Sequence, residues 1–168
     1  GKINKNSDEY DVLVFASRGI TNATIPSFIK KIGEFAFNHC ENLSKINFSK
    51  NSDVRTFEEN SFSYSSINKF FVPSGVTRIG NSSFFACKNL RYVRIPNDSE
   101  LQTIEFNAFA YSSIECFEIS PHVIEIGEGA FNGCYDLQIV EIGDNSKSIA
   151  ISFMMFINCG KVLIMISN

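Results

Sequence analysis

The segment VPSGVTRIGNSSFFAC, residues 72–87, contains the pattern that decides the fold. Its central window, IGNSSF, places a phenylalanine five residues after an isoleucine, and an Ile or Phe followed by Phe at this spacing occurs six times. The six windows are IGEFAF from Ile32, FEENSF from Phe57, IGNSSF from Ile79, IEFNAF from Ile104, IGEGAF from Ile126 and ISFMMF from Ile151. Their starts alternate between 25 and 22 residues apart, so two units of unequal length form the true period. An internal repeat of this size predicts a solenoid.

Residue type changes together with unit length. Three residues after each terminal Phe stands a Cys or a Ser, with Cys in the longer units and Ser in the shorter ones until the last unit breaks the alternation. These residues are Cys40, Ser65, Cys87, Ser112, Cys134 and Cys159. The short units also have compact turns at Pro73 and Pro121 where the long units have longer connections. Chance matches do not vary in this concerted way.

Each unit continues with apolar residues at positions one, four and six, as at Leu90, Val93 and Ile95. The alternation from the fourth to the sixth position predicts a strand with one buried face. A second short apolar pair, such as Val76 with Ile79, predicts another extended segment on the opposite side of the coil. We therefore expect a repeat solenoid, mostly β with short turns and helical pieces, in six to seven coils of alternating 25 and 22 residues.

One unit cannot bury its own Phe and Ile, but coils stacked about 4.8 Å apart form a continuous core. The stack predicts an internal ladder of equivalent residues from successive units. Its aromatic members are Phe37, Phe62, Phe84, Phe109, Phe131 and Phe156, and its thiol members are Cys40, Cys87, Cys134 and Cys159. We predict one solenoid domain over residues 10–168, with an N-terminal cap at about 10–31 and repeats at about 32–168. Residues 1–9, which begin with Gly rather than Met, are interpreted as disordered or as a cloning remnant.

Composition and charge exclude several functions. The net charge is −3, the pI is about 5.4 and 20% of the residues are charged, which argues against nucleic acid as a partner. An apolar stretch at residues 149–166 has nearly the length of a membrane span, but Asn158, Gly160 and Lys161 interrupt it. The repeat register explains this stretch better, so no membrane insertion is expected.

The reactive side chains do not form a catalytic or metal-binding pattern. Cys40 and Cys87, two coils apart, would lie about 10 Å from each other on the strand spacing, beyond the usual disulfide limit of about 7 Å. The ladder cysteines are therefore interpreted as buried thiols, whereas Cys116 falls on an outward strand face. The two histidines, His39 and His122, lie in different coils and predict neither a zinc site nor a triad. The repeated window glycines indicate turns rather than a phosphate loop. We expect no enzyme activity and no cofactor.

The outward face of the strands is the most informative surface. Residues flanking each fourth position should point to solvent, and they form a basic and aromatic half that grades into an acidic and apolar half. The predicted ligand-contact residues are Lys45, Lys69, Phe71, Tyr92, Arg94, Glu118, Ile139 and Glu141. Exposed aromatic and arginine side chains dominate the energetics of many interfaces.

At this point the pattern L-x-x-[IVF]-x-[IVF]-P-x-x-V-x-x-I-G-x-x-A-F-x-x-C, fullest in residues 72–87 and in 90–96 joined to the window from Ile126, resembles the BspA-type leucine-rich repeats. The resemblance covers nearly everything from about Tyr10 to Ser167. It implies a surface-exposed or secreted protein of a mucosal bacterium or parasitic protist that adheres to host cells, to matrix proteins such as fibronectin or to other microbes. It implies no catalytic residues. The last unit departs from the pattern, because Leu163, Ile164 and Ile166 stand where earlier units are mostly polar.

Two functions remain open. The first is a non-enzymatic recognition module that binds a protein or glycan on another cell or matrix through its strand face. The alternative is a structural spacer or self-associating stalk whose sheet edges and apolar last unit pair end to end. Five N-x-[ST] sequons, at Asn22, Asn42, Asn47, Asn81 and Asn97, weakly support a secretory route. A glycan attached to Asn47 would obstruct the strand face.

Overall fold

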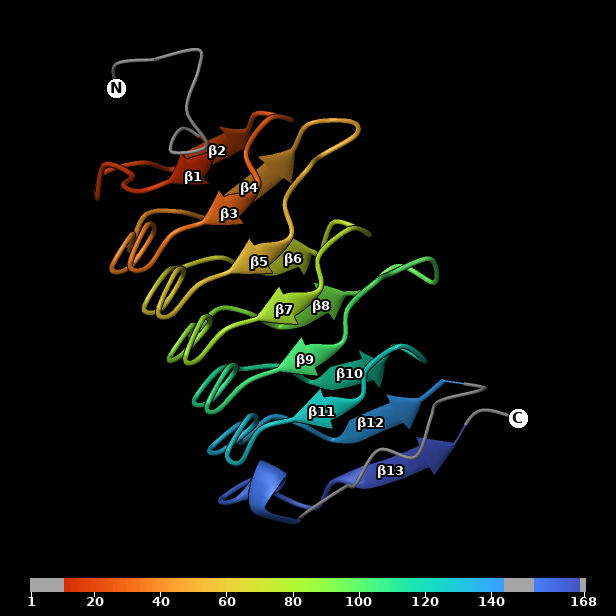
Figure 1. Cartoon of the computed structure of the whole chain (residues 1–168). Helices are drawn as coiled ribbons and strands as arrows, with labels where there is room; N and C mark the ends of the chain where they lie inside the picture. The colour runs from red at the N-terminus through yellow and green to blue at the C-terminus, as the bar shows by residue number, and fades with distance from the viewer. Residues whose placement is uncertain (1–10, 144–152, 167–168) are drawn as a thin grey trace.

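The computed structural model describes residues 11–143 and 153–166 and shows a stack of coils with two layers of parallel strands (Figure 1). Strands of one layer run toward compact turns at one edge of the stack, and strands of the other layer run back toward longer loops at the opposite edge. The predicted solenoid is therefore confirmed. The predicted disordered tail, residues 1–9, and the start of the last window, residues 151–152, lie outside the described residues.

The first layer is a continuous six-stranded parallel sheet of two-residue strands. It contains β1 (Val12–Leu13), β3 (Lys31–Ile32), β5 (Thr56–Phe57), β7 (Arg78–Ile79), β9 (Thr103–Ile104) and β11 (Glu125–Ile126). The window residues are in register, because Ile32 pairs with Phe57, Phe57 with Ile79, and Ile79 with Ile104. The first residue of each of these windows thus occupies the same place in its coil. The sequence predicted this strand layer as the second extended segment of each unit.

The second layer is interrupted. It contains β2 (Asn22–Ile25) and β4 (Lys45–Phe48) as one sheet, and β6 (Lys69–Phe71), β8 (Tyr92–Arg94), β10 (Cys116–Ile119), β12 (Ile139–Ile142) and β13 (Leu163–Ile166) as another. The strands within each sheet are parallel and hydrogen-bonded, but β4 and β6 are not paired. The sequence pattern gave no reason to expect this break.

The compact turns after the odd-numbered strands are almost identical from coil to coil. In the turns around Phe37, Phe62, Phe84, Phe109 and Phe131, the residues two positions before and two positions after the ladder Phe have φ between 52° and 66°; in the last turn only the residue after Phe156 does. They include Phe35, Asn60, Ser82, Asn107 and Gly129 before it, and His39, Tyr64, Ala86, Tyr111, Gly133 and Asn158 after it. The alternating conformation aims backbone N–H groups along the stack, as when Phe62 N donates to Ser83 O at 2.8 Å and Phe84 N to Ala108 O at 2.7 Å.

The first glycine of the long windows has a different role from the turn conformation that the sequence indicated. Gly33, Gly80 and Gly127 do not have positive φ. A Cβ on Gly80 would lie 2.6 Å from the Phe57 carbonyl oxygen of the preceding coil. These glycines are therefore required by close backbone approach between coils, because only a residue without a Cβ leaves room for the carbonyl.

The six ladder phenylalanines stack along the axis of the solenoid. Ring centroids of neighbouring members lie 4.9 to 5.7 Å apart with interplanar angles of 9° to 14°. Beside the rings runs a column of alternating thiols and hydroxyls, in which Cys87 Sγ donates to Phe62 O at 3.1 Å and lies 3.4 Å from Ser65 Oγ. This arrangement satisfies buried polar groups in the interior with neighbours from the adjacent coil.

Candidate ligand-binding face

The outward side of β6 and β8 carries the two aromatic residues that the sequence placed at the ligand face. Phe71 is 53% exposed and Tyr92 is 44% exposed, although both side chains are large and apolar enough to favour burial. Their ring centroids lie 6.3 Å apart in an edge-to-face arrangement. Together they form a small exposed aromatic pair on a rigid sheet.

Three cations surround this pair without a counterion. Lys69 is in register with Tyr92, and Phe71 is in register with Arg94, while Lys45 projects from β4 across the sheet break. All three are exposed, and no ion pair between described residues includes any of them. Uncompensated exposed cations leave this half of the face positively charged and available for an acidic or polar partner.

The acidic half lies over β10 and β12. Glu118 is exposed and in register with Glu141, whereas Glu141 and Ile139 are half-buried rather than fully solvent-facing. A depression of about 250 Å³ brings this half together with part of the other, because Tyr92, Arg94, Glu118 and Glu141 all line it with the exposed Cys116. A second depression of about 290 Å³ brings together Lys45, Lys69 and Phe71. Most of the predicted ligand-contact residues thus line two separate depressions, and their role in ligand binding stays a prediction.

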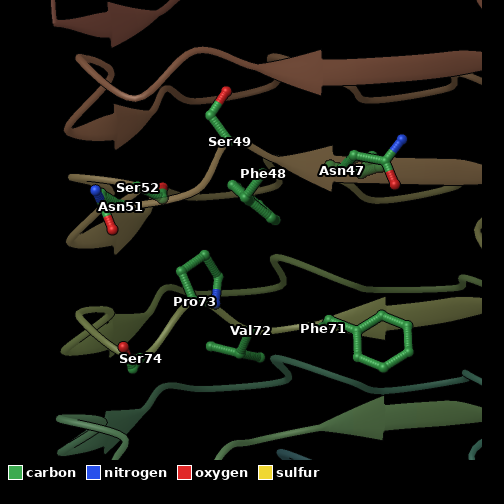
Figure 2. A pocket seen from close by; sticks show the side chains of 10 residues that line it. Asn47, Phe48, Ser49, Asn51, Ser52, Phe71, Val72, Pro73 and Ser74 are labelled. Atoms are coloured by element: carbon green, nitrogen blue, oxygen red, sulfur yellow. The ribbon is translucent and has the colours of Figure 1, made fainter.

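A larger depression, of about 480 Å³, lies at the break between β4 and β6 (Figure 2). Asn47 and Phe71 lie at one end, Asn51, Ser52 and Ser74 at the other, and Phe48 and Pro73 between them. Sequence reasoning identified Phe71 and considered Asn47, but it missed the depression. The available signal was Phe48, which stands where the other described strands have the smaller Ile or Val.

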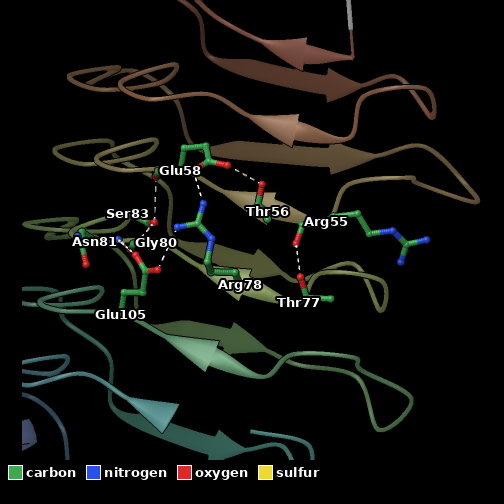
Figure 3. A network of polar contacts seen from close by, with 9 residues as sticks. All are labelled: Arg55, Thr56, Glu58, Thr77, Arg78, Gly80, Asn81, Ser83 and Glu105. Atoms are coloured by element: carbon green, nitrogen blue, oxygen red, sulfur yellow. Dashed lines mark hydrogen bonds and ion pairs between the residues drawn. The ribbon is translucent and has the colours of Figure 1, made fainter. Parts of the chain in front are cut away.

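A polar network between the first-layer strands is structural (Figure 3). The Arg78 guanidinium lies between Glu58 and Glu105, with Nη1 3.0 Å from Glu105 Oε1 and Nη2 in contact with Glu58. Burial raises the pKa of the Glu58 carboxyl, but hydrogen bonds from Thr56 and Arg78 outweigh burial and lower it below its usual value. Both carboxylates occupy the position that glycine has in the long units. The network joins three coils, and the charges of Arg78, Glu58 and Glu105 are paired with one another.

The thiols divide into buried and exposed groups. Burial raises the pKa of Cys87 to about 11 and that of Cys134 to about 12, so both are protonated and unreactive at neutral pH. His39 stacks on Tyr64 at 4.4 Å and contacts Glu41, away from any second histidine. Over the described residues there is no group of three or more His, Cys, Asp and Glu side chains that could hold a metal ion.

The last coil ends in an apolar surface. In β13, Leu163, Ile164, Met165 and Ile166 are all exposed, although Ile164 and Ile166 are in register with the buried Val140 and Ile142 of β12. Their exposure follows from their place at the end of the described stack. Residues 11–143 and 153–166 include no helix whose length and apolar character would let it span a membrane.

Comparison with known proteins agrees with this architecture. The chain matches the model of the BspA type leucine-rich repeat region, in six copies, over residues 8–138 and 55–167. The chain therefore belongs to the BspA-type leucine-rich repeat family. No curated protein sequence matches it significantly.

Solved structures of a vaccine antigen and of two leucine-rich repeat proteins share the fold. The pneumococcal vaccine antigen PcpA is 27% identical with a TM-score of 0.74, over 76% of this chain and 32% of PcpA. The T. pallidum leucine-rich repeat protein is 25% identical with a TM-score of 0.68, over 74% of this chain and 59% of that protein. A leucine-rich cell surface protein of Faecalibacterium prausnitzii, 24% identical over 79% of this chain and 41% of that protein, shares the fold with a TM-score of 0.57. The chain spans about a third of PcpA.

Proposed function

We propose that this chain is a non-enzymatic adhesion module that binds a protein or glycan on host cells, extracellular matrix or other microbes through its strand face. The observation that carries the proposal is the exposed pair of Phe71 and Tyr92, flanked by the unpaired cations Lys69 and Arg94. Aromatic and arginine side chains on a preorganised surface lose little conformational entropy on binding. A place on the cell surface or in the secreted fraction accords with the family and with the surface antigens of similar fold.

The test is saturable binding of the purified module to intact mucosal epithelial cells. We expect the double variant Phe71→Asp, Tyr92→Asp to lose at least tenfold in affinity at unchanged circular dichroism. The matched control is Phe106→Asp, Tyr135→Asp, which alters two exposed aromatic residues outside the strand layer. If the folded double variant binds cells as well as the wild type does, Phe71 and Tyr92 are not part of the binding site.

A self-associating stalk is the second candidate, and the exposed apolar strand β13 favours it. Among the described strands only β12 pairs with it, and its other edge offers backbone hydrogen-bonding groups together with four apolar side chains, which suits pairing with another chain. Sedimentation velocity between about 1 and 100 μM tests the candidate, since self-association with a micromolar dissociation constant would raise the average mass over this range. A mass that stays monomeric over this range excludes it. A mass that rises, and falls again in Ile164→Lys, supports it.

A further inference from the structure

The break in the second strand layer leaves backbone groups without strand partners. Backbone pairing joins β2 to β4, β6 to β8, β8 to β10, β10 to β12 and β12 to β13. Between β4 and β6, both of which are fully described, there is no such pairing. Unpaired N–H and C=O groups at a sheet interior are costly unless water or a ligand satisfies them. The facing edges of β4 and β6 are therefore a place where a polar ligand gains hydrogen bonds.

The side chain of Phe48 explains why the strands separate. The equivalent residues Ile25, Val72, Ile95, Ile119 and Ile142 are buried, whereas Phe48 is only half-buried. Its ring lies edge-on to that of Phe70 at 5.8 Å and also contacts Phe57 at 6.2 Å. The Phe48 ring, packed edge-on against Phe70, needs more room than the Ile or Val that the other strands have at the same position, and the two strands part to accommodate it.

The depression that results has an uncharged and mixed lining. Five of its residues are apolar and five are neutral polar; these are Ile46, Phe48, Phe71, Val72 and Pro73, with Asn47, Ser49, Asn51, Ser52 and Ser74. Its volume of about 480 Å³ suits a small ligand, since such sites measure about 300–1,000 Å³. No lining side chain carries a charge, and Lys45 and Lys69 line the neighbouring depression that shares Phe71, so the interior of this site itself has no group to compensate a phosphate, sulfate, carboxylate or ammonium group.

Three of the five polar side chains that line the depression are free to bind a ligand. The other two are already hydrogen-bonded: Ser49 Oγ donates to Ile25 O at 2.9 Å, and Ser52 Oγ accepts from Val54 N at 3.4 Å. The side chains of Asn47, Asn51 and Ser74 make no hydrogen bond to any described residue, so their donors and acceptors both remain available. In Figure 2 these groups lie at the two ends of the depression, with Phe48, Val72 and Pro73 between them.

We propose that this depression binds an uncharged glycan segment of one or two sugar residues. Sugar hydroxyls both donate and accept, so they complement the free amides, the Ser74 hydroxyl and the unpaired strand edges. The apolar C–H face of a sugar ring packs against Phe48 and Pro73 in the middle of the site. A purely apolar ligand would leave the amides and backbone groups unpaired, at the cost of a lost hydrogen bond for each. The inference rests on the proposed function, because it names a ligand class for the same face.

The first experiment is binding to an array of neutral, sialylated and sulfated oligosaccharides, with each hit measured by calorimetry. The protein is made in a host that does not glycosylate Asn47, whose sequon would otherwise obstruct the site. We expect saturable binding to neutral glycans, and a loss of at least tenfold in affinity for Asn47→Ala, Ser74→Ala. The matched control is Ser66→Ala, Asn89→Ala, which alters the same two residue types in a depression outside the strand layer that also contains Glu41 and Lys88. The control should bind as the wild type does.

A second variant tests the break itself. Phe48→Ile should let β4 and β6 pair, which would raise hydrogen-exchange protection of the β6 amides and lower glycan affinity at least tenfold. Binding only to charged glycans, or equal loss in the control variant, would overturn the proposal. Capture of a neutral peptide instead of any glycan would also overturn it. If the module binds cells through Phe71 and Tyr92 but no neutral glycan, the adhesion function stands and the glycan site falls; if no cell binding occurs, both fall.

Discussion

The turn edge and the strand face belong to the same coils but differ in regularity. At the turn edge each coil from that of Phe37 to that of Phe131 has a stacked Phe and backbone hydrogen bonds to the next coil. On the strand face the sheet stops between β4 and β6, and outward residues change from basic to acidic along the stack. The difference shows that structural repetition is concentrated where coils are in closest contact, which leaves the strand face free to vary.

Crowding is the physical reason for this division. A turn residue contacts both neighbouring coils through its backbone, and a single Cβ at Gly80 or Gly127 would meet backbone atoms of the preceding coil within 2.6 Å. An outward residue such as Tyr92 meets mainly solvent and its own strand neighbours. Substitutions should therefore lower stability at the turn edge and change binding at the strand face.

The largest expected effect is truncation of the ladder. Phe84 is fully buried and stacks between Phe62 at 4.9 Å and Phe109 at 5.2 Å. Phe84→Ala should lower the free energy of unfolding by about 3–5 kcal/mol, because it leaves a cavity that the rigid stack cannot close. Urea unfolding measures this loss, and the exposed Phe106→Ala serves as a control within about 0.5 kcal/mol of wild type. Equal urea midpoints for Phe84→Ala and Phe106→Ala would contradict the view that stability is concentrated in the stacked turn edge.

The next effect is steric. Gly80→Ala places a Cβ 2.6 Å from the Phe57 carbonyl oxygen, so neighbouring coils must separate. We expect a loss of about 1–3 kcal/mol, typical of overpacking. Thermal unfolding against Gly19→Ala, where nothing lies within 4 Å of the added Cβ, isolates the steric contribution from general loss of glycine flexibility. A Gly80 variant as stable as the Gly19 variant would show that the coils tolerate separation.

A smaller effect concerns the Arg78 network. Because its hydrogen bonds lower the pKa of Glu58 below 4.5, the network stabilises the fold above that pH, and the stabilisation is lost as the pH falls through the folded-state value. Arg78 and Glu58 are both partly exposed, so Arg78→Met should cost only about 1 kcal/mol at pH 7. Unfolding free energies measured from pH 7 to pH 3 should show the gap from wild type narrowing toward acid. A gap that widens instead would exclude this linkage.

The smallest effect on stability is expected from labelling the strand face at Cys116. A thiol reagent at pH 8 should modify Cys116, which is exposed, and leave Cys87 and Cys134 unmodified because burial raises their pKa values to about 11 and about 12. Labelling of Cys116 alone should change the unfolding free energy by less than about 0.5 kcal/mol. Mass spectrometry counts the labels, and denatured protein should take five. Rapid native labelling of Cys87 would contradict its burial.

Much of the fold followed from periodic burial. The Phe windows predicted the stacked coils because a residue with the same spacing in every unit must occupy the same place in a solenoid. The alternation around Val93 and Phe117 likewise predicted strands with one buried face. The outward positions of Phe71 and Tyr92 follow from that alternation, but their role in ligand binding stays a prediction.

The remaining features depend on contacts between coils that no spacing within one unit contains. One window position is Gly80 in one coil and Glu58 or Glu105 in the neighbouring coils. Within the sequence this position only varies, but in the stack both carboxylates form ion pairs with Arg78. Phe48 likewise satisfies the apolar pattern, and its size becomes decisive only opposite Phe70.

The amino-acid sequence by itself thus determined the repeat, the coil and the outward positions, because each depends on local alternation and a fixed unit length. The tertiary structure alone decided where the strand layer is interrupted, which charges are neutralised internally and where the uncharged depression lies. These properties arise from how side chains of different size and charge meet between neighbouring coils. Units that are similar in pattern can therefore differ in the surface they present.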